Sequence, residues 1–301
     1  MVSDLQHDAR NSNQAIWPIM ILAHNEADHI VACLDSLYSA EPDRQFRIFV
    51  MANGCTDNTE DIVKAYSVKH PDVELVSIAM ADKCNAWNVY IHQVIPEKVP
   101  GYSVYFFVDG DARVCPLALT ELAKGLQENP EAKAASALPA SGRSMQRDRQ
   151  DMLAGNRLVA NLYALSGEFV RHLQQKQVCI PLGLEGDDGL IGALVKWDLD
   201  PTQEHVKARI QPCEKAGFVF DSMTWTKLND WKSYWRRMIR YARRAYEFEL
   251  LGRQLKREGI EGMPTKISEL YKGARDCKLR WSGIHTIFFW LALREMRKHV
   301  E

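Results

Sequence analysis

Residues 104–111, VYFFVDGD, are the stretch that decides the fold we predict for this chain. Its first five residues are apolar on both faces of a strand, as in strands that are buried on both sides of a parallel sheet. Two carboxylates separated by a glycine follow directly, at Asp109-Gly110-Asp111. Because a buried strand that delivers two acids to a rim is costly unless the acids are paired, the stretch predicts a sheet with a site at its edge.

Further apolar runs on both sides of this stretch alternate with segments of helical spacing. Strands are expected at Ile16–Ala23, Phe46–Met51, Val73–Ile78 and Lys133–Leu138, and helices between them, including Lys83–Val94 and Leu117–Leu126. Continuous apolar strands that alternate with helices indicate an α/β fold, with a mostly parallel sheet sandwiched by helices.

Polar clusters follow three of these strands, at the positions where each strand ends. They are His24-Asn25-Glu26, Asn53-Gly54 and Asp109-Gly110-Asp111. In parallel sheets the ligands bind beyond the carboxyl ends of the strands. We therefore predict that the three clusters share one rim and form a site there.

The second half of the chain is expected to be mainly helical. Residues 141–150 (SGRSMQRDRQ) are polar and predict a loop, whereas apolar spacing predicts helices at Leu158–Gln174, Glu185–Val195 and Trp231–Leu255. At least one more helix is expected within Lys266–Val300. We divide the chain into a first part, residues 1–230, which carries the predicted site, and a basic helical extension, residues 231–301, packed on the same domain.

The composition is that of an ordinary globular chain, with 301 residues, 46% hydrophobic and 26% charged. It excludes collagen-like and disordered chains. The net charge of −1 gives no bias toward nucleic acid, so no nucleic-acid partner is expected. Residues 231–301, however, carry 17 Lys and Arg against 8 Asp and Glu, which suggests that this part meets an anion.

The cysteines and the N-terminal sequence bear on the compartment. Seven scattered cysteines without a CxxC pair indicate neither a zinc site nor a disulfide framework. The first residues lack the apolar core of a signal peptide, and no run approaches the roughly 20 apolar residues that span a bilayer. The prediction is a cytoplasmic protein.

Asp109 and Asp111 are the first candidate chemical groups. Mg²⁺ and Mn²⁺ favour oxygen ligands and commonly bridge to a substrate phosphate, although a DxD tripeptide alone also occurs in ordinary turns. Asn53 could contact a base or ribose, and Lys83 and Asn88 a phosphate or nucleoside. The Asn53-Gly54 pair equally fits a turn followed by a helix cap.

Glu185-Gly186-Asp187-Asp188 is a second acidic cluster, at the start of an expected helix. The helix dipole accounts for one acid in a first turn, but three acids within four residues repel one another. One of these carboxylates could serve as general base for a hydroxyl nucleophile.

Together these motifs resemble glycosyltransferase family 2. Ala23-His24-Asn25-Glu26 is similar to the family's A-Y-N-E, and residues 53–57 (NGCTD) to its D-G-S-T-D segment. Residues 83–88 resemble K-x-x-A-x-N, with Ala86 one place from the usual position. Asp109-Gly110-Asp111 matches D-x-D, and Asp187-Asp188 stands where an E-D pair opens a helix.

The resemblance implies a GT-A fold and a nucleotide-diphosphate-sugar donor, with residues 1–230 as the nucleotide-sugar-binding and catalytic part. It implies Mn²⁺ or Mg²⁺ at Asp109 and Asp111, and inversion by direct displacement with Asp188, or Asp187, as base. The acceptor is an unidentified hydroxyl, and an anionic or a lipid-linked acceptor is left open. The residues expected at the nucleotide are Ala23, Asn25, Glu26, Asn53, Lys83, Asn88, Asp109 and Gly110.

Two departures from the family pattern bear on the contact to the nucleobase and on the type of sugar transfer. Ala52 stands at the position of the first acid in the family's D-D-G-S segment. A contact to the nucleobase of the donor must therefore come from Asn53 or from elsewhere. The Q-x-x-R-W motif of processive synthases is absent. With no membrane-spanning run, transfer of a single sugar is expected rather than polymer synthesis.

The basic part of the extension is an amphipathic helix. Arg236 and Arg240 are weaker candidates for contacts to the diphosphate or the acceptor, and the same face carries Lys232, Arg243 and Arg244. Contact with acidic lipid on the inner membrane face is a third hypothesis, and a solvated face a fourth. Residues 287–293 (IFFWLAL) are expected to be a core helix rather than an interfacial anchor.

Two other functions remain open on the sequence. A sugar-phosphate nucleotidyltransferase would carry a Gly-rich, basic phosphate loop after the first strand, but residues 23–30 (AHNEADHI) have neither glycine nor Lys or Arg. A non-catalytic nucleotide-binding module is the other alternative, although such a module has no need of Asp188.

Overall fold

A computed structural model describes residues 16–142, 145–220 and 228–299, with the backbone alone at 228–233. Its centre is an eight-stranded sheet of order β3-β2-β1-β4-β7-β6-β8-β5. The strands are β1 (Ile16–Ala23), β2 (Gln45–Asn53), β3 (Val73–Ile78), β4 (Val104–Asp109), β5 (Arg113–Val114), β6 (Ala134–Pro139), β7 (Leu162–Ser166) and β8 (Ile210–Val219).

The sheet has a parallel half and a mixed half. Strands β3, β2, β1 and β4 are parallel, and β6 is parallel to β8. Strand β7 runs antiparallel to β4 and β6, and β5 antiparallel to β8. The predicted α/β fold with a mostly parallel sheet is confirmed.

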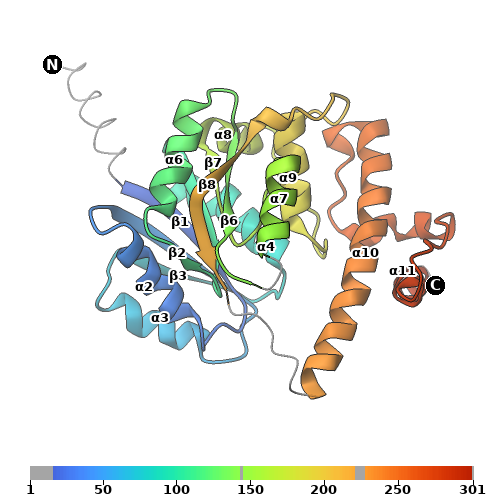
Figure 1. Cartoon of the computed structure of the whole chain (residues 1–301), viewed down its shortest axis with the longest axis horizontal. Coiled ribbons are helices and arrows are strands. Elements are labelled where there is room, and N and C mark those ends of the chain that lie inside the picture. The colour runs from blue at the N-terminus through green and yellow to red at the C-terminus, as the bar shows by residue number, and fades with distance from the viewer. Residues whose placement is uncertain (1–15, 143–144, 221–227, 300–301) are drawn as a thin grey trace.

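Helices cover both faces of the sheet (Figure 1). Successive strand residues point to opposite faces, so Ile19 and Ile21 pack in one core layer and Met20 in the other. The first layer lies under α2 (Ile30–Ala40), α3 (Thr59–Ser67) and α6 (Ala118–Glu128). The second lies under α4 (Lys83–Val89), η1 (Tyr90–Val94), α5 (Ile95–Lys98), α8 (Gly167–Gln175), α9 (Asp187–Trp197) and α10 (Leu228–Glu258).

The C-terminal elements share this second core layer. After the short η2 (Lys207–Arg209) and β8, they are α10, η3 (Ile260–Gly262), η4 (Ile267–Arg275) and α11 (Thr286–Lys298). Tyr246 and Leu250 of α10 and Met296 of α11 are buried in one cluster with Trp87 and Leu190. In Figure 1, α10 stands beside the sheet and α11 lies on the outer side of α10. The division at residue 230 stays a prediction.

Two predicted elements are wrong. Met145–Gly155 forms helix α7, although residues 141–150 were expected to be a loop; within α7 only Met152 is buried, so no apolar stripe marks it. Leu162–Ser166 forms strand β7, and the expected helix Leu158–Gln174 is helical only from Gly167, where α8 begins. Pairing with β4 and β6 prevails there over the helical spacing of the leucines.

Among the described helices, none combines the length and apolar character needed to cross a bilayer.

Candidate active site

The loops after β1 and β2 are fastened to each other by side chains. The Asn53 amide donates to the Ala23 carbonyl (2.8 Å), and the Asn25 side-chain oxygen accepts from the Thr56 N–H (2.8 Å). The Glu26 N–H donates to the Thr59 hydroxyl (2.8 Å). These bonds bring together two of the three predicted polar clusters at the carboxyl edge of the sheet.

Gly110 brings the third cluster to the same edge. Its N–H donates to the Leu22 carbonyl (2.8 Å), and a Cβ on Gly110 would lie 3.0 Å from that oxygen and 3.2 Å from Cγ of Glu26. Asp109 and Asp111 therefore flank a point of close approach to β1. Burial raises the pKa of the Glu26 carboxyl, and the negative charges of Asp111 and Asp109 raise it further.

Lys83, the first residue of α4, links the two acidic segments. Its Nζ lies 3.0 Å from Oδ1 of Asp109 and 3.4 Å from Oδ2 of Asp187. Burial lowers the pKa of Lys83, but the two carboxylates outweigh burial, so the net shift is upward. The pKa of Asp109 is raised, because burial outweighs the attraction of Lys83.

Two predicted nucleotide residues make backbone contacts instead of standing open. Asn88 exchanges two hydrogen bonds of 2.8 Å with the backbone of Ile180. Asn53 is buried, and its side-chain amide donates a hydrogen bond to the Ala23 carbonyl. In the structure both side chains position loops, and their contact with nucleotide stays a prediction.

The second acidic cluster opens helix α9. Gly186 has φ +88° and precedes the first turn. Asp187 is buried and turned toward Lys83, whereas Asp188 is half-buried and accepts from Arg244 (3.0 Å). Burial raises the pKa of Asp188, and Arg244 offsets part of that rise.

Helix α10 supplies the cations that face this cluster. Arg244 pairs with Asp188, while Arg243 donates to Glu185 and lies 3.6 Å from Glu247. The basic face of α10 is therefore partly paired with carboxylates of the same chain. The Lys232 side chain lies outside the described residues.

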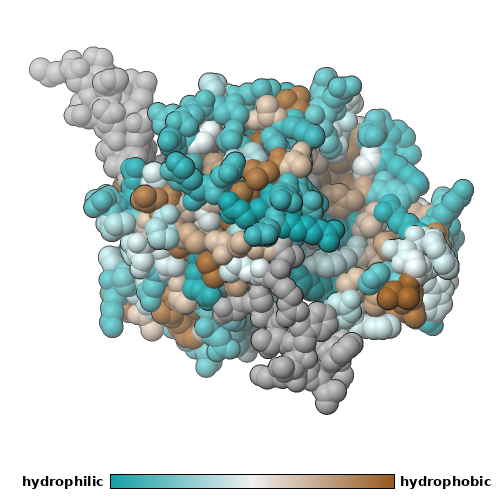
Figure 2. Space-filling view, in the orientation of Figure 1, coloured by the Kyte–Doolittle hydropathy of each residue, from teal (hydrophilic) through white to brown (hydrophobic). Residues whose placement is uncertain are grey.

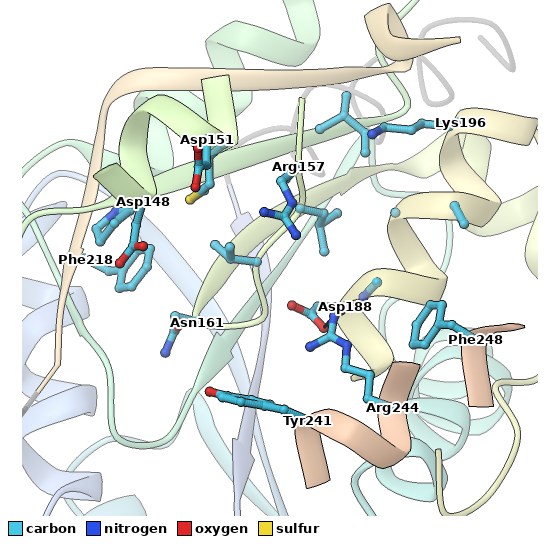
Figure 3. A pocket seen from close by; sticks show the side chains of 18 of the residues that line it. Asp148, Asp151, Arg157, Asn161, Asp188, Lys196, Phe218, Tyr241, Arg244 and Phe248 are labelled. Atoms are coloured by element: carbon cyan, nitrogen blue, oxygen red, sulfur yellow. Dashed lines mark hydrogen bonds and ion pairs between the residues drawn. The ribbon is translucent and has the colours of Figure 1, made fainter. Parts of the chain in front are cut away.

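Two cavities meet at this helix. The smaller, of about 370 Å³, is lined by Lys83, Asp109, Glu185, Gly186, Arg237, Arg240, Tyr241 and Arg244. The larger, of about 660 Å³, has Asp188 in its wall and shares Tyr241 and Arg244 with the smaller. Figure 3 shows Asp188 from α9 beside Arg244 from α10, with Arg157 directed into the same space. Of the two predicted arginines, Arg240 lines the smaller cavity and Arg236 lines neither.

Sequence reasoning missed Arg237, Tyr241 and the pairing role of Arg244. A relaxed motif would have found the first two, because Arg237-Met238-Ile239-Arg240-Tyr241 has the spacing of Q-x-x-R-W with Arg for Gln and Tyr for Trp. The pairing of Arg244 with Asp188 joins residues 56 positions apart, and no local pattern predicts it.

The mixed α/β sheet is that of a GT-A fold. The family model of glycosyl transferase family 2 matches residues 19–177, more than half of the chain. The chain belongs to this family and is a glycosyltransferase, as predicted. This identification favours the predicted glycosyltransferase over the two alternatives, a sugar-phosphate nucleotidyltransferase and a non-catalytic nucleotide-binding module.

Solved structures share the fold at low identity. A mannosyltransferase from Pyrobaculum calidifontis in complex with GDP-Man and Mn²⁺ is 15% identical, with TM-score 0.59, covering 95% of this chain and 86% of that chain. Glucosyl-3-phosphoglycerate synthase from Mycobacterium tuberculosis, in complex with Mn²⁺, UDP and phosphoglyceric acid, is 17% identical (TM-score 0.52; 78% and 80% covered). TarS 1–349 from S. aureus, in complex with UDP-GlcNAc, is 15% identical (TM-score 0.50; 95% and 81% covered).

A comparison with curated protein sequences finds no match.

Proposed function

We propose that this glycosyltransferase moves one sugar from a nucleotide-diphosphate-sugar to an acceptor hydroxyl, with inversion at the anomeric carbon. The observation that carries the proposal is the pair of adjoining cavities that share Tyr241 and Arg244, with Asp188 in the wall of the larger. The smaller cavity would take the donor diphosphate and the larger the acceptor.

Charge supports the donor assignment. Four cationic side chains line the smaller cavity, and charge-assisted hydrogen bonds from such groups are the usual way to hold phosphate oxygens. They are Lys83, Arg237, Arg240 and Arg244. The solved structures with GDP-Man and UDP-GlcNAc are consistent with a nucleotide-sugar donor.

The metal assignment rests on Asp109 and Asp111. Among the described residues no group of three or more His, Cys, Asp or Glu is arranged around a metal position. Two carboxylates nonetheless fit Mg²⁺ or Mn²⁺, since phosphate and water commonly complete the shell of such ions. A cation bound there would neutralise charge on the departing diphosphate, and two of the similar structures were solved with Mn²⁺.

Asp188 suits the role of base better than Asp187. Asp187 is buried, its carboxylate lies 3.4 Å from Nζ of Lys83, and it does not line the larger cavity. Asp188 faces the acceptor cavity, and its raised pKa strengthens it as a proton acceptor. The acceptor oxygen would attack the anomeric carbon as its proton passes to Asp188, while the bond to the diphosphate oxygen breaks on the opposite face.

The test is Asp188→Asn, with Asp43→Asn as the matched control. Asp43 is an exposed acid in the loop between α2 and β2 and lines neither cavity. Release of nucleoside diphosphate from GDP-mannose, UDP-glucose or UDP-N-acetylglucosamine is measured with Mn²⁺. We expect Asp188→Asn to lower turnover by about 10²–10⁴-fold with donor affinity unchanged, and the control to stay near wild type. Equal turnover in both variants would remove Asp188 from the mechanism, and pyrophosphate release would indicate nucleotidyl transfer.

A further inference from the structure

The segment that leads into α11, together with the outer face of that helix, exposes large apolar side chains. Trp281 is 85% and Ile284 87% exposed, and Leu279, Ile287 and Trp290 are each about half exposed. We call these five residues the apolar patch. The opposite face of α11 is buried in the core through Phe288, Ala292, Leu293 and Met296.

Such exposure is unusual for a soluble monomer and marks an interaction surface. Ile287 and Trp290 are three residues apart on α11 and so lie on one helix face. Figure 2 shows hydrophobic surface over α11, next to hydrophilic side chains. Residues 287–293 are thus both a core helix, as predicted, and the carrier of an exposed apolar face.

Cationic side chains border the apolar patch. A cavity of about 350 Å³ is floored by Leu279, Trp290 and Leu293 and bordered by Arg294, Arg297 and Lys298, with no acidic residue in its described lining. The Arg294 guanidinium lies over the Trp290 indole at 5.5 Å. From Lys272 to Lys298 the chain has seven Lys and Arg and only two acids.

We propose that this surface docks on an anionic lipid bilayer. The apolar patch would enter the boundary between headgroups and acyl chains, where tryptophan is favoured, and the cationic cavity would receive a lipid phosphate. An apolar face bordered by Lys and Arg is the pattern of helices that lie in this interface.

A second copy of the chain fits this surface less well. A twofold contact would place the same residues of both copies against each other. The cations of Arg294, Arg297 and Lys298 would then face identical cations, whereas an anionic bilayer complements them.

The surface is coupled to the catalytic part through α10. Trp235 packs on Phe288 with ring centroids 4.8 Å apart, and Arg243 lies 3.8 Å from Glu295. Helix α10 also carries Arg240 and Arg244, which line the cavities of the candidate active site. Docking would therefore hold these cavities at a fixed distance from the bilayer surface. This inference goes beyond the proposed function and does not depend on it.

The test is flotation of the full chain with vesicles of phosphatidylcholine, with and without phosphatidylglycerol. We expect binding to the anionic vesicles alone, weakened by added salt. The double variant Trp281→Ser/Ile284→Ser and, separately, Arg294→Glu/Lys298→Glu should each weaken binding about tenfold or more. Val68→Ser is the matched control, since Val68 is equally exposed but lies after α3.

Three outcomes would overturn the proposal. They are no binding of wild type to anionic vesicles, equal binding by the wild type and both double variants, or a dimer in sedimentation that the Trp281→Ser/Ile284→Ser variant loses. Release of nucleoside diphosphate from a soluble donor should stay unchanged in every variant, which shows that the fold is intact.

Discussion

Gly186 illustrates how one residue shapes the site. Its φ of +88° is a conformation that other residues rarely adopt, and a Cβ there would lie 2.3 Å from Nε of Arg244. The backbone turn into α9 therefore favours glycine, and the Arg244 side chain occupies the space that a Cβ would need. In this position Arg244 pairs with Asp188.

Replacing Gly186 by alanine should lower the free energy of unfolding by about 1–3 kcal/mol, because the substitution adds backbone strain and a clash. Turnover should fall as well, since Arg244 is displaced. Gly252→Ala is the control: Gly252 lies within α10 with open space around it, so alanine should stabilise the protein by up to about 1 kcal/mol. Urea denaturation measures both, and equal stabilities would contradict the packing described.

The pH dependence of turnover should report on Asp188. A base must be ionised, so kcat/KM should fall as pH decreases through its pKa, and burial places that pKa above the ordinary aspartate value. Arg244 lowers it, so Arg244→Met should move the acid limb of the profile to higher pH. Arg253→Met, on an exposed turn of the same helix, should leave the limb in place. An unshifted limb in Arg244→Met would argue that another group titrates.

At the scale of elements, α10 joins three parts of the molecule. Glu247, at its centre, is fully buried and accepts from the Glu185 N–H (3.1 Å) and the Tyr271 hydroxyl (2.6 Å). Burial raises the pKa of this carboxyl. Glu247 therefore fixes α10 both to the segment before α9 and to η4.

Glu247→Ala should lower the free energy of unfolding by about 3–5 kcal/mol, because the Tyr271 hydroxyl and the Glu185 N–H lose their acceptor and Arg243 loses one of its carboxylates. Glu249→Ala, two residues away, removes only the more exposed pairs with Arg253 and Arg280 and should cost less than about 1 kcal/mol. Thermal denaturation of both variants is the measurement. Comparable losses would show that Glu247 has no special role.

The elements that the sequence predicts well are those with a local signature. Strand β1 and the first five residues of β4 are continuous apolar runs because helices cover both of their faces. Helix α7 has one buried residue and so lacks a periodic stripe, and β7 becomes a strand only through its partners β4 and β6. Long-range pairing is invisible to a window of neighbouring residues.

The same distinction holds for the site. Asp109, Asp111 and Asp188 could be predicted because acids at strand and helix ends are local features. Asp109 and Asp188 line the two cavities, and the chemical roles of all three stay predictions. Other contacts join segments that are far apart in the sequence. They are the hydrogen bonds of the Asn53 and Asn88 side chains and the ion pair of Arg244 with Asp188. Residue type and spacing therefore predict the acids of the site better than their partners.

At the scale of the whole molecule, one core layer runs from α4 through α9 to α10 and α11. The catalytic part and the C-terminal helices consequently share buried surface. A ligand bound between α4, α9 and α10 should stabilise the entire chain, because it binds the native state alone.

We therefore expect a nucleoside diphosphate with Mn²⁺ to raise the melting temperature more than either component alone. Asp111→Ala should abolish the metal-dependent part of that rise, as should EDTA. Asp43→Ala, an exposed acid in the loop between α2 and β2, is the control and should keep it. A full shift in Asp111→Ala, or full activity in excess EDTA, would contradict the metal role.

Arg244 borders both cavities while it holds Asp188. The diphosphate of an incoming donor would compete for the Arg244 guanidinium and weaken its ion pair with the Asp188 carboxylate. Donor binding in the smaller cavity would thereby free Asp188 to act as base in the larger cavity. We therefore expect a compulsory order of substrate addition, in which the nucleotide-sugar enters first and the acceptor second.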